Sequence, residues 1–253
     1  MARRPQNLDL YVFDYEEYEQ RSTKKTQKKT KVSKIDGLGL IDFLPKTPNQ
    51  ERMFADFFEG YNILNIGSAG SGKTVCALYL ALQKLITNEV EKIVIVRSAT
   101  SIRPQGFLPG TLAEKEEVYT LPYKQLVNFL FHNDTAWESL TKRGHIEFIT
   151  TSYIRGLTFE NSIIVFDELQ NTDVSECYTL LTRLGEGCRI IICGDFKQND
   201  IERKREFSSF GWIVRLLEKV PDYFRIISFT HDDIVRSDLV KQLIIAAEEL
   251  DEE

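Results

Sequence analysis

A short glycine-rich stretch, residues 67–74, has the composition and spacing of a phosphate-binding loop. Its sequence, GSAGSGKT, fits the pattern G-x-x-x-x-G-K-[ST]. Glycines permit a tight loop whose N–H groups point at phosphate oxygens, and the following helix adds positive potential. We expect Lys73 to reach the β- and γ-phosphates and the Thr74 hydroxyl to ligate Mg²⁺. The predicted nucleotide-binding residues are Gln50, Gly67, Ser68, Ala69, Gly70, Ser71, Gly72, Lys73, Thr74 and Val75.

Two adjacent carboxylates follow an apolar run in SIIVFDELQ, residues 162–170. Asp167 is placed to hold the Mg²⁺ directly or through water. Glu168 suits a base that polarises a water molecule against the γ-phosphate. A kinase that transfers the phosphoryl group to another substrate has no need of this glutamate, so the pair favours hydrolysis.

Two glutamines complete the predicted nucleotide site. Gln198 follows the apolar run of RIIICGDFKQND, residues 189–200, and its neutral amide could sense the γ-phosphate or orient water. Gln50, in KTPNQ, could offer a donor and an acceptor to the adenine edge and so select ATP. For a lone glutamine, a place on the surface is the alternative.

The elements that must position these groups alternate along the chain. A strand that is buried on both faces appears in the sequence as a short run rich in Ile and Val. We expect strands at 62–67, 92–97, 145–150, 162–168, 189–195 and 225–230. Helical spacing is found at 73–87, 123–140, 173–184, 208–219 and 237–250. This alternation predicts an α/β fold with a mostly parallel sheet and helices on both faces.

The first 45 residues differ from the remainder. Residues 21–34 carry seven Lys and Arg side chains and no acid. Such a block repels itself and lacks core-forming residues, so we expect a flexible arm at 1–45 and an ATPase domain at 46–253. The basic block is either a solvated linker or a segment attracted to nucleic-acid phosphates.

The composition argues against several classes of protein. The formal net charge is −6, so a nucleic-acid contact would need a local basic patch. Four cysteines without a CxxC pair and three histidines argue against zinc and against a disulfide framework. No apolar run approaches the roughly 18 residues of a membrane span. We therefore expect a soluble, cytoplasmic protein without a membrane partner.

The motifs together resemble the PhoH-like ATPases, a RecA-like group close to the superfamily 1 helicases. The stretches that carry the resemblance are TPNQ, GSAGSGKT, RSATSIRPQGFLPGTLAEK, SYIRGLTFENSIIVFDELQNT, LLTRLGEGCRIIICGDFKQND and DDIVRSDLV, within residues 46–247. The chain departs from the pattern at Leu169, where a small residue is usual, and at Asp200-Ile201-Glu202. The resemblance implies a RecA-like P-loop domain, in the short stand-alone or phage-type form without a PIN domain. If the chain is phage-encoded, its compartment is the bacterial host cytoplasm.

A single RecA-like lobe lacks the arginines that a second lobe supplies in two-lobed helicases. An arginine supplied in trans can be worth about 10³–10⁵ in rate. We therefore expect subunits to form a ring, with a hexamer favoured, in which each site receives an arginine from its neighbour. Arg236, in DDIVRS, and Arg155, in SYIRG, are the candidates. A surface salt bridge is the alternative for either residue.

Nucleic-acid contacts follow from the resemblance, because in such helicases the loop after the second strand touches the strand backbone. Here that loop offers Arg97, Ser98 and Arg103, whose side chains could hold phosphates. Phe107 could stack on a base, although local packing is the alternative. The preference for RNA over DNA rests on the family alone.

These expectations combine into an ATP hydrolase, dependent on Mg²⁺, that binds, translocates along or unwinds single-stranded nucleic acid, with RNA favoured. The principal alternative is a nucleotide-gated assembly module that binds ATP with little turnover. A phosphoryl-transfer kinase and a purely nucleic-acid-binding protein are further alternatives. In the last of these Lys73 would not matter.

Overall fold

The core of the protein is a six-stranded parallel sheet. The computed structural model describes residues 38–98, 112–195 and 209–250. The strand order is β3-β2-β4-β5-β1-β6, and each neighbouring pair is parallel. The strands are β1 (Asn62–Gly67), β2 (Lys92–Arg97), β3 (Ile146–Thr150), β4 (Ser162–Asp167), β5 (Arg189–Asp195) and β6 (Phe224–Phe229). All six predicted strands are confirmed within one residue at either end, and the fold is the expected α/β one with a parallel sheet.

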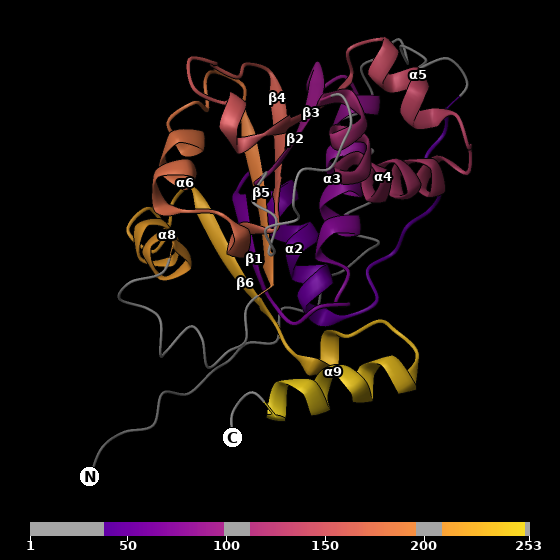
Figure 1. The fold of residues 1–253 in the computed structure, drawn as a ribbon, viewed down its shortest axis with the longest axis vertical. Coiled ribbons are helices and arrows are strands. Elements are labelled where there is room, and N and C mark those ends of the chain that lie inside the picture. Colours follow the sequence, from indigo (N-terminus) through magenta and orange to yellow (C-terminus); the bar gives the residue numbers. More distant parts are fainter. Residues whose placement is uncertain (1–37, 99–111, 196–208, 251–253) are drawn as a thin grey trace. The chain divides into compact units, whose positions relative to one another are not determined.

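Helices cover both faces of this sheet (Figure 1). One side carries α2 (Pro48–Phe58), α3 (Lys73–Ile86), α4 (Leu112–Phe131) and α5 (Ala136–Lys142). The other side carries α6 (Val174–Leu181) and α8 (Ser209–Leu217). The last helix is α9 (Asp238–Leu250), and three short 3₁₀ turns are η1 (Thr151–Tyr153), η2 (Leu169–Asn171) and η3 (His231–Asp233). No helix in the described ranges combines the length and apolar character that crossing a bilayer requires.

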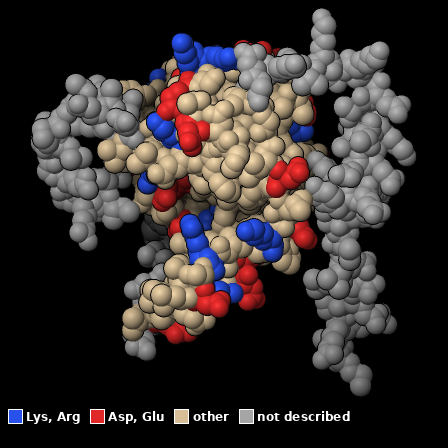
Figure 2. Space-filling view, turned by 90° about the vertical axis from the view of Figure 1, so that its right-hand side faces the viewer, with Lys and Arg blue, Asp and Glu red and all other residues tan. Residues whose placement is uncertain are grey.

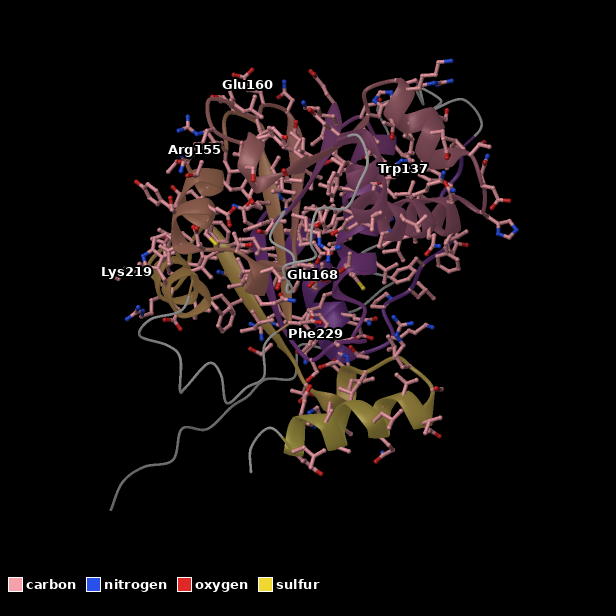
Figure 3. All side chains as sticks on the ribbon, in the orientation of Figure 1. Trp137, Arg155, Glu160, Glu168, Lys219 and Phe229 are labelled. Carbon is pink, nitrogen blue, oxygen red and sulfur yellow. The ribbon has the colours of Figure 1, made fainter. Side chains whose placement is uncertain are left out.

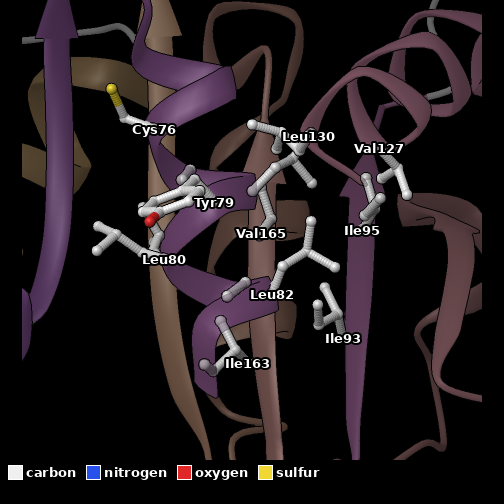
Figure 4. Packing of buried hydrophobic residues seen from close by; sticks show 14 of the residues in the cluster. Cys76, Tyr79, Leu80, Leu82, Ile93, Ile95, Val127, Leu130, Ile163 and Val165 are labelled. Carbon is white, nitrogen blue, oxygen red and sulfur yellow. The ribbon is translucent and has the colours of Figure 1, made fainter. Parts of the chain in front are cut away.

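Alternate residues of each strand enter two separate apolar cores, because successive side chains of a strand point to opposite faces. In β4, Ile163 and Val165 pack under α3, whereas Ile164 and Phe166 pack under α6 and α8. Figure 4 shows the first core, where Leu82 of α3 lies among side chains of β2 and β4. The sheet is thus buried on both faces, and Asp167 and Glu168 lie at the carboxyl end of β4.

The helical assignments differ from the prediction at two places. The predicted helix 123–140 is two helices, α4 and α5, and α4 begins well before Pro122. The break falls at His132, whose φ is 48°, and at Asn133, whose side chain accepts hydrogen bonds from Thr135. Helix α2 was not predicted, although Thr47 caps it and Pro48 occupies its first turn, which are both helix-start signals.

Residues 38–43 lie against the domain rather than apart from it. Leu38, Leu40, Ile41 and Phe43 pack on the core beneath α3, and the Ile41 N–H donates to the Leu130 carbonyl. The last part of the segment that was expected to belong to the arm therefore packs with the domain. The remainder of that segment, residues 1–37, lies outside the described residues.

Candidate active site

The loop between β1 and α3 has a path that only glycine can follow at two positions. Gly67 has φ 138°, and a Cβ there would lie 2.1 Å from the Phe229 carbonyl oxygen. Gly72 has φ 81° and is the N-cap of α3, without a side chain to cap the first N–H groups. Those N–H groups and the helix dipole remain directed into the loop, which makes the start of α3 suited to an anion.

Lys73 is buried inside this loop, with a side chain 5% exposed. Its Nζ donates to the Gly67 and Ser68 carbonyls at 3.0 and 2.8 Å and to Ser71 Oγ at 3.1 Å. It also lies 2.6 Å from Asp195 Oδ1, at the end of β5. The ammonium group is thus held at the centre of the loop, between the ends of β1 and β5.

Thr74 and Asp167 meet across the sheet edge. Thr74 Oγ1 lies 3.1 and 3.2 Å from the two carboxylate oxygens of Asp167. Tyr123 of α4 donates from its hydroxyl to Asp167 Oδ2 at 3.0 Å. Burial raises the pKa of Asp167, and the hydrogen bonds from Tyr123 and Thr74 oppose that rise. Burial and then the Asp167 charge raise the pKa of Tyr123, so its hydroxyl remains the donor.

This pair fits Mg²⁺. Magnesium takes oxygen donors, keeps several waters and usually binds one or two protein groups together with substrate phosphates. Thr74 and Asp167 supply hydroxyl and carboxylate oxygens close enough to share one ion. Within the described ranges no three His, Cys, Asp or Glu side chains form a metal cage. The donor set therefore matches a metal that is shared with a nucleotide.

Glu168 follows β4 in a left-handed conformation, φ 57° and ψ 45°. Non-glycine residues adopt this region rarely, and at functional sites the cost is accepted because the turn aims a side chain. Its Oε1 lies 4.0 Å from Arg97 Nη2, and its Oε2 accepts from Gln170 Nε2 at 2.6 Å. Burial and then the Asp167 charge raise the pKa of Glu168, whereas Arg97 lowers it. In Figure 3, Glu168 is labelled near the middle of the view, and in the chain it directly follows β4.

Predicted groups that follow two different strands, β1 and β4, converge on one pocket. Lys73, Thr74, Asp167 and Glu168 all line it, and so does Arg236. The full lining is Gly70, Gly72, Lys73, Thr74, Val75, Leu126, Asp167, Glu168, Gln170, Gly194, Asp195 and Arg236.

Gln50 contacts the phosphate loop from α2. Its Nε2 donates to the Ser71 carbonyl at 2.8 Å, and its Oε1 accepts from the Lys46 N–H at 2.7 Å. The side chain is 1% exposed and does not line the pocket. The structure therefore shows Gln50 as a support of the loop. Contact with adenine stays a prediction and would require this amide to use its remaining hydrogen-bonding capacity.

The two candidate arginines have different positions. Arg236 lies beside the phosphate loop of its own chain, because the Val235 N–H donates to the Gly70 carbonyl at 3.1 Å. A Cβ on Gly70 would lie 3.0 Å from Arg236 Cγ. Arg236 lines the pocket of its own chain, and its expected role as an arginine supplied in trans stays a prediction. Arg155 is exposed, and Figure 3 shows it pointing outward near α6, away from Glu168.

The predicted nucleic-acid residues are only partly described. Arg97 is the last residue of β2 and lies between Glu168 and the Tyr119 ring, 5.8 Å from the ring centroid. Ser98 is 3% exposed. Arg103, Phe107 and Gln198 lie outside the described residues, so their roles stay predictions.

The side that carries α4 and α5 does not present a continuous basic face within the described residues. Figure 2 shows its Lys and Arg side chains in small groups among Asp and Glu, around a broad area of other residues. The exposed apolar side chains Val118 and Phe129 belong to α4. On the described surface, Arg97 beside the pocket is therefore a more specific candidate for phosphate contact than this side of the molecule.

Three residues of the site were not assigned roles from the sequence. Tyr123 lies in an apolar helix and reads as a core aromatic, so no signal distinguished it. Gln170 and Asp195 belong to the quoted motifs, and their positions directly after β4 and at the end of β5 were the available signal. The structure connects both to the predicted groups, Gln170 to Glu168 and Asp195 to Lys73.

Comparison with known proteins agrees with these motifs. A family model described as PhoH-like protein matches residues 42–248. The chain is 35% identical over 211 residues to a PhoH-like protein of Mycobacterium leprae, covering 82% of this chain and 59% of that protein. It is 34% identical over 203 residues to a PhoH-like protein of Bacillus subtilis, covering 79% of this chain and 62% of that protein. The chain thus spans about three fifths of the length of these relatives.

Among solved structures, the large terminase of a thermophilic bacteriophage is similar with a TM-score of 0.49 and 14% identity. The alignment covers 79% of this chain and 50% of the terminase. A likeness this distant adds nothing to the assignment of function, which depends on the family and on the geometry of the pocket.

Proposed function

The chain belongs to the PhoH-like protein family, and from this premise we propose that its domain is a magnesium-dependent ATP hydrolase. One observation carries the proposal. Lys73, Asp167 and Glu168, which come from two separate motifs, line a single pocket at the carboxyl ends of the strands. A phosphate-binding lysine, a metal-binding carboxylate and a candidate base are the groups that hydrolysis of a nucleoside triphosphate requires.

Each group has a distinct role in this proposal. The start of α3 and Lys73 hold the β- and γ-phosphates, and Lys73 exchanges its contact with Asp195 for phosphate oxygens. Thr74 and Asp167 hold Mg²⁺, which would neutralise the charge that develops on the phosphates. Glu168 accepts a proton from the attacking water. Gln198 senses the γ-phosphate, and Gln50 contacts adenine.

Arg236 adds positive charge to the same pocket from within the chain. Its neighbour Val235 is hydrogen-bonded to Gly70, so the guanidinium is held beside the phosphate loop. We propose that it stabilises phosphate charge in cis. This differs from the expectation that a neighbouring subunit supplies it.

We further propose that hydrolysis is coupled to single-stranded nucleic acid, with RNA favoured on the family resemblance. Arg97 supports the coupling because it ends β2 only 4.0 Å from the carboxylate of Glu168. A phosphodiester that binds Arg97 would therefore act directly beside the proposed base. Arg103 and Phe107 belong to the same proposed contact.

We also propose assembly into a ring, a hexamer by preference, in which Arg155 reaches the pocket of a neighbouring subunit. Arg155 is exposed and stands away from its own pocket, as an arginine acting in trans must.

The decisive test is steady-state ATP hydrolysis over a range of protein concentrations, alone and with single-stranded RNA or DNA. We expect the rate per subunit to rise with concentration and with nucleic acid. Glu168→Gln should lower kcat by about 10²–10⁴ while ATP still binds. Glu160→Gln, an exposed glutamate remote from the pocket, is the matched control. A Glu168→Gln protein as active as the parent would refute the assigned base, and a flat low rate would favour the nucleotide-gated assembly module.

Mixing variants separates an arginine in trans from one in cis. Arg155→Ala subunits keep an intact pocket, and Glu168→Gln subunits keep Arg155, so a mixture should regain part of the activity that each lacks. Arg236→Ala mixed with Glu168→Gln should regain none, because both changes inactivate the chain that carries them. If activity recovered with Arg236→Ala and not with Arg155→Ala, Arg236 would be the arginine acting in trans and Arg155 the one acting in cis.

A further inference from the structure

A continuous path of polar contacts joins the phosphate-binding lysine to the proposed base. Lys73 Nζ lies 2.6 Å from Asp195 Oδ1. The Asp195 N–H donates to Gln170 Oε1 at 2.9 Å. The other end of the same amide, Gln170 Nε2, donates to Glu168 Oε2 at 2.6 Å. Gln170 thus uses both of its polar ends to join β5 to the residue that follows β4.

The local fold explains why Gln170 stands beside Glu168. The Glu168 carbonyl accepts from the Asn171 N–H at 2.9 Å, which closes the η2 turn. Leu169 is fully buried in the core under α6 and α8. Anchoring Leu169 leaves the side chains on either side of it facing the pocket. The large residue at this position therefore fixes the geometry of the turn.

Purely structural bonding would not require an amide at this position. A side chain that only filled the space between β4 and β5 could be apolar. A side chain that only joined the two strand ends would need no hydrogen bond beyond the one with the Asp195 N–H. Gln170 instead makes a short hydrogen bond to a carboxylate that already carries a charge partner, Arg97. Hydrogen bonds to charged groups are the stronger class, and they fix direction as well as distance.

We propose that Gln170 is a positioning residue that sets the orientation of the Glu168 carboxylate according to the state of the phosphate loop. The inference rests on the proposed hydrolase function. When Lys73 turns to phosphate oxygens, Asp195 loses its partner, and the end of β5 can shift. Gln170 transmits that shift to Glu168, because it holds the Asp195 backbone with one end and the base with the other.

Two substitutions test the two hydrogen bonds of the Gln170 amide separately. Gln170→Leu removes both hydrogen bonds. Gln170→Glu keeps an acceptor for the Asp195 N–H and replaces the donor to Glu168 by a carboxylate oxygen. We expect kcat to fall by roughly ten- to hundredfold in both, since a small misplacement of a reacting group has that effect. The Kd for ATP should stay within about twofold, because the interaction acts on the transition state.

Hydrogen–deuterium exchange supplies a readout that does not depend on turnover. In the protein without nucleotide, Gln170→Leu should speed exchange at the end of β5, because the Asp195 N–H loses its acceptor. Gln170→Glu should leave that exchange slow. Gln83→Leu is the control. It removes another partly buried amide, which bonds to Tyr79 on α3, and it should change neither kcat nor the exchange at the end of β5.

A double variant distinguishes positioning from a general effect on the fold. Gln170→Leu combined with Glu168→Gln should be no slower than Glu168→Gln alone, because Gln170 acts only through the base. An additive loss, a parental kcat in Gln170→Leu, or unchanged exchange at Asp195 would each overturn the inference. A parent protein that does not hydrolyse ATP would overturn the proposed function instead, and the exchange measurement would then decide whether Gln170 links the two strand ends.

Discussion

The hydroxyl of Tyr123 donates a hydrogen bond to the carboxylate of Asp167 at 3.0 Å, which joins the middle of α4 to the end of β4. The tyrosine is 1% exposed, and Asp167 also receives the Thr74 hydroxyl. In the proposed magnesium role of Asp167, a carboxylate whose direction is fixed by a buried hydroxyl would be pre-organised for the ion.

Removal of that hydroxyl should weaken the magnesium site. Mutation of a residue that hydrogen-bonds to a metal ligand typically lowers metal affinity or activity by about 10–100-fold. We expect Tyr123→Phe to raise the Mg²⁺ concentration that supports half-maximal hydrolysis by that order. Tyr79→Phe is the matched control, since the Tyr79 hydroxyl pairs with Gln83 instead. Equal magnesium dependence in the two variants would contradict the assignment.

Gly67 should tolerate no side chain. An alanine Cβ would lie 2.1 Å from the Phe229 carbonyl oxygen, at a φ of 138°. We expect Gly67→Ala to lower the free energy of unfolding by at least about 4 kcal/mol or to prevent folding. Gly144→Ala separates the two causes, because Gly144 has φ 76° but open space around it. Its cost should be about 1 kcal/mol, from backbone strain alone, as measured by urea denaturation.

Asp233 should make stability depend on acid pH. Its burial raises the pKa, but hydrogen bonds from Thr47, Asn49 and Thr230 outweigh burial, and the net pKa lies below 3.8. Because the folded pKa is depressed, the stabilisation is present above the unfolded pKa and is lost as the pH falls through the folded pKa. Asp233→Asn should lose stability at neutral pH and show a smaller further decline below about pH 4. Denaturation curves of parent and variant that stay parallel down to about pH 2 would exclude this role.

The four cysteines should differ in reactivity. Burial raises the pKa of Cys76 and of Cys177 to about 12, and it also raises the pKa of Cys193. Cys188 is the half-buried member of the set. Because the thiolate is the reactive form, we expect iodoacetamide to modify Cys188 first and the others only on unfolding. Intact-mass measurement should show one modification in the parent protein and none in Cys188→Ser. Rapid modification of all four thiols would contradict the described burial.

The sheet was predictable because its strands are buried on both faces. Runs such as KIVIVR and SIIVFD leave few alternatives to a central parallel strand, and the phosphate loop fixes the strand before it. The helix α2 was not predicted, although Thr47 and Pro48 are signals of its start.

Site residues were predictable where they belong to a short motif. They were not predictable where packing between distant parts of the chain brings them to the site. Asp167 ends β4 and Glu168 follows it, and Lys73 and Thr74 follow the loop after β1, so the parallel order of the strands brings these groups to one edge. Arg236 reaches the pocket only because a loop after the last strand returns to Gly70, a contact that no local pattern encodes. Tyr123 is similarly set by the packing of α4 on the sheet.

The pairing of β6 with β1 has a consequence for biosynthesis. Gly67, at the start of the phosphate loop, is in register with Phe229, and the Phe229 carbonyl restricts what can stand at Gly67. The loop is translated early, whereas the strand against which it packs emerges from the ribosome much later. Before that strand arrives, β1 has an unpaired edge, and the nascent chain lacks a completed phosphate loop. The ability to hold a nucleotide should therefore be acquired late in synthesis, only after nearly all of the domain has been made.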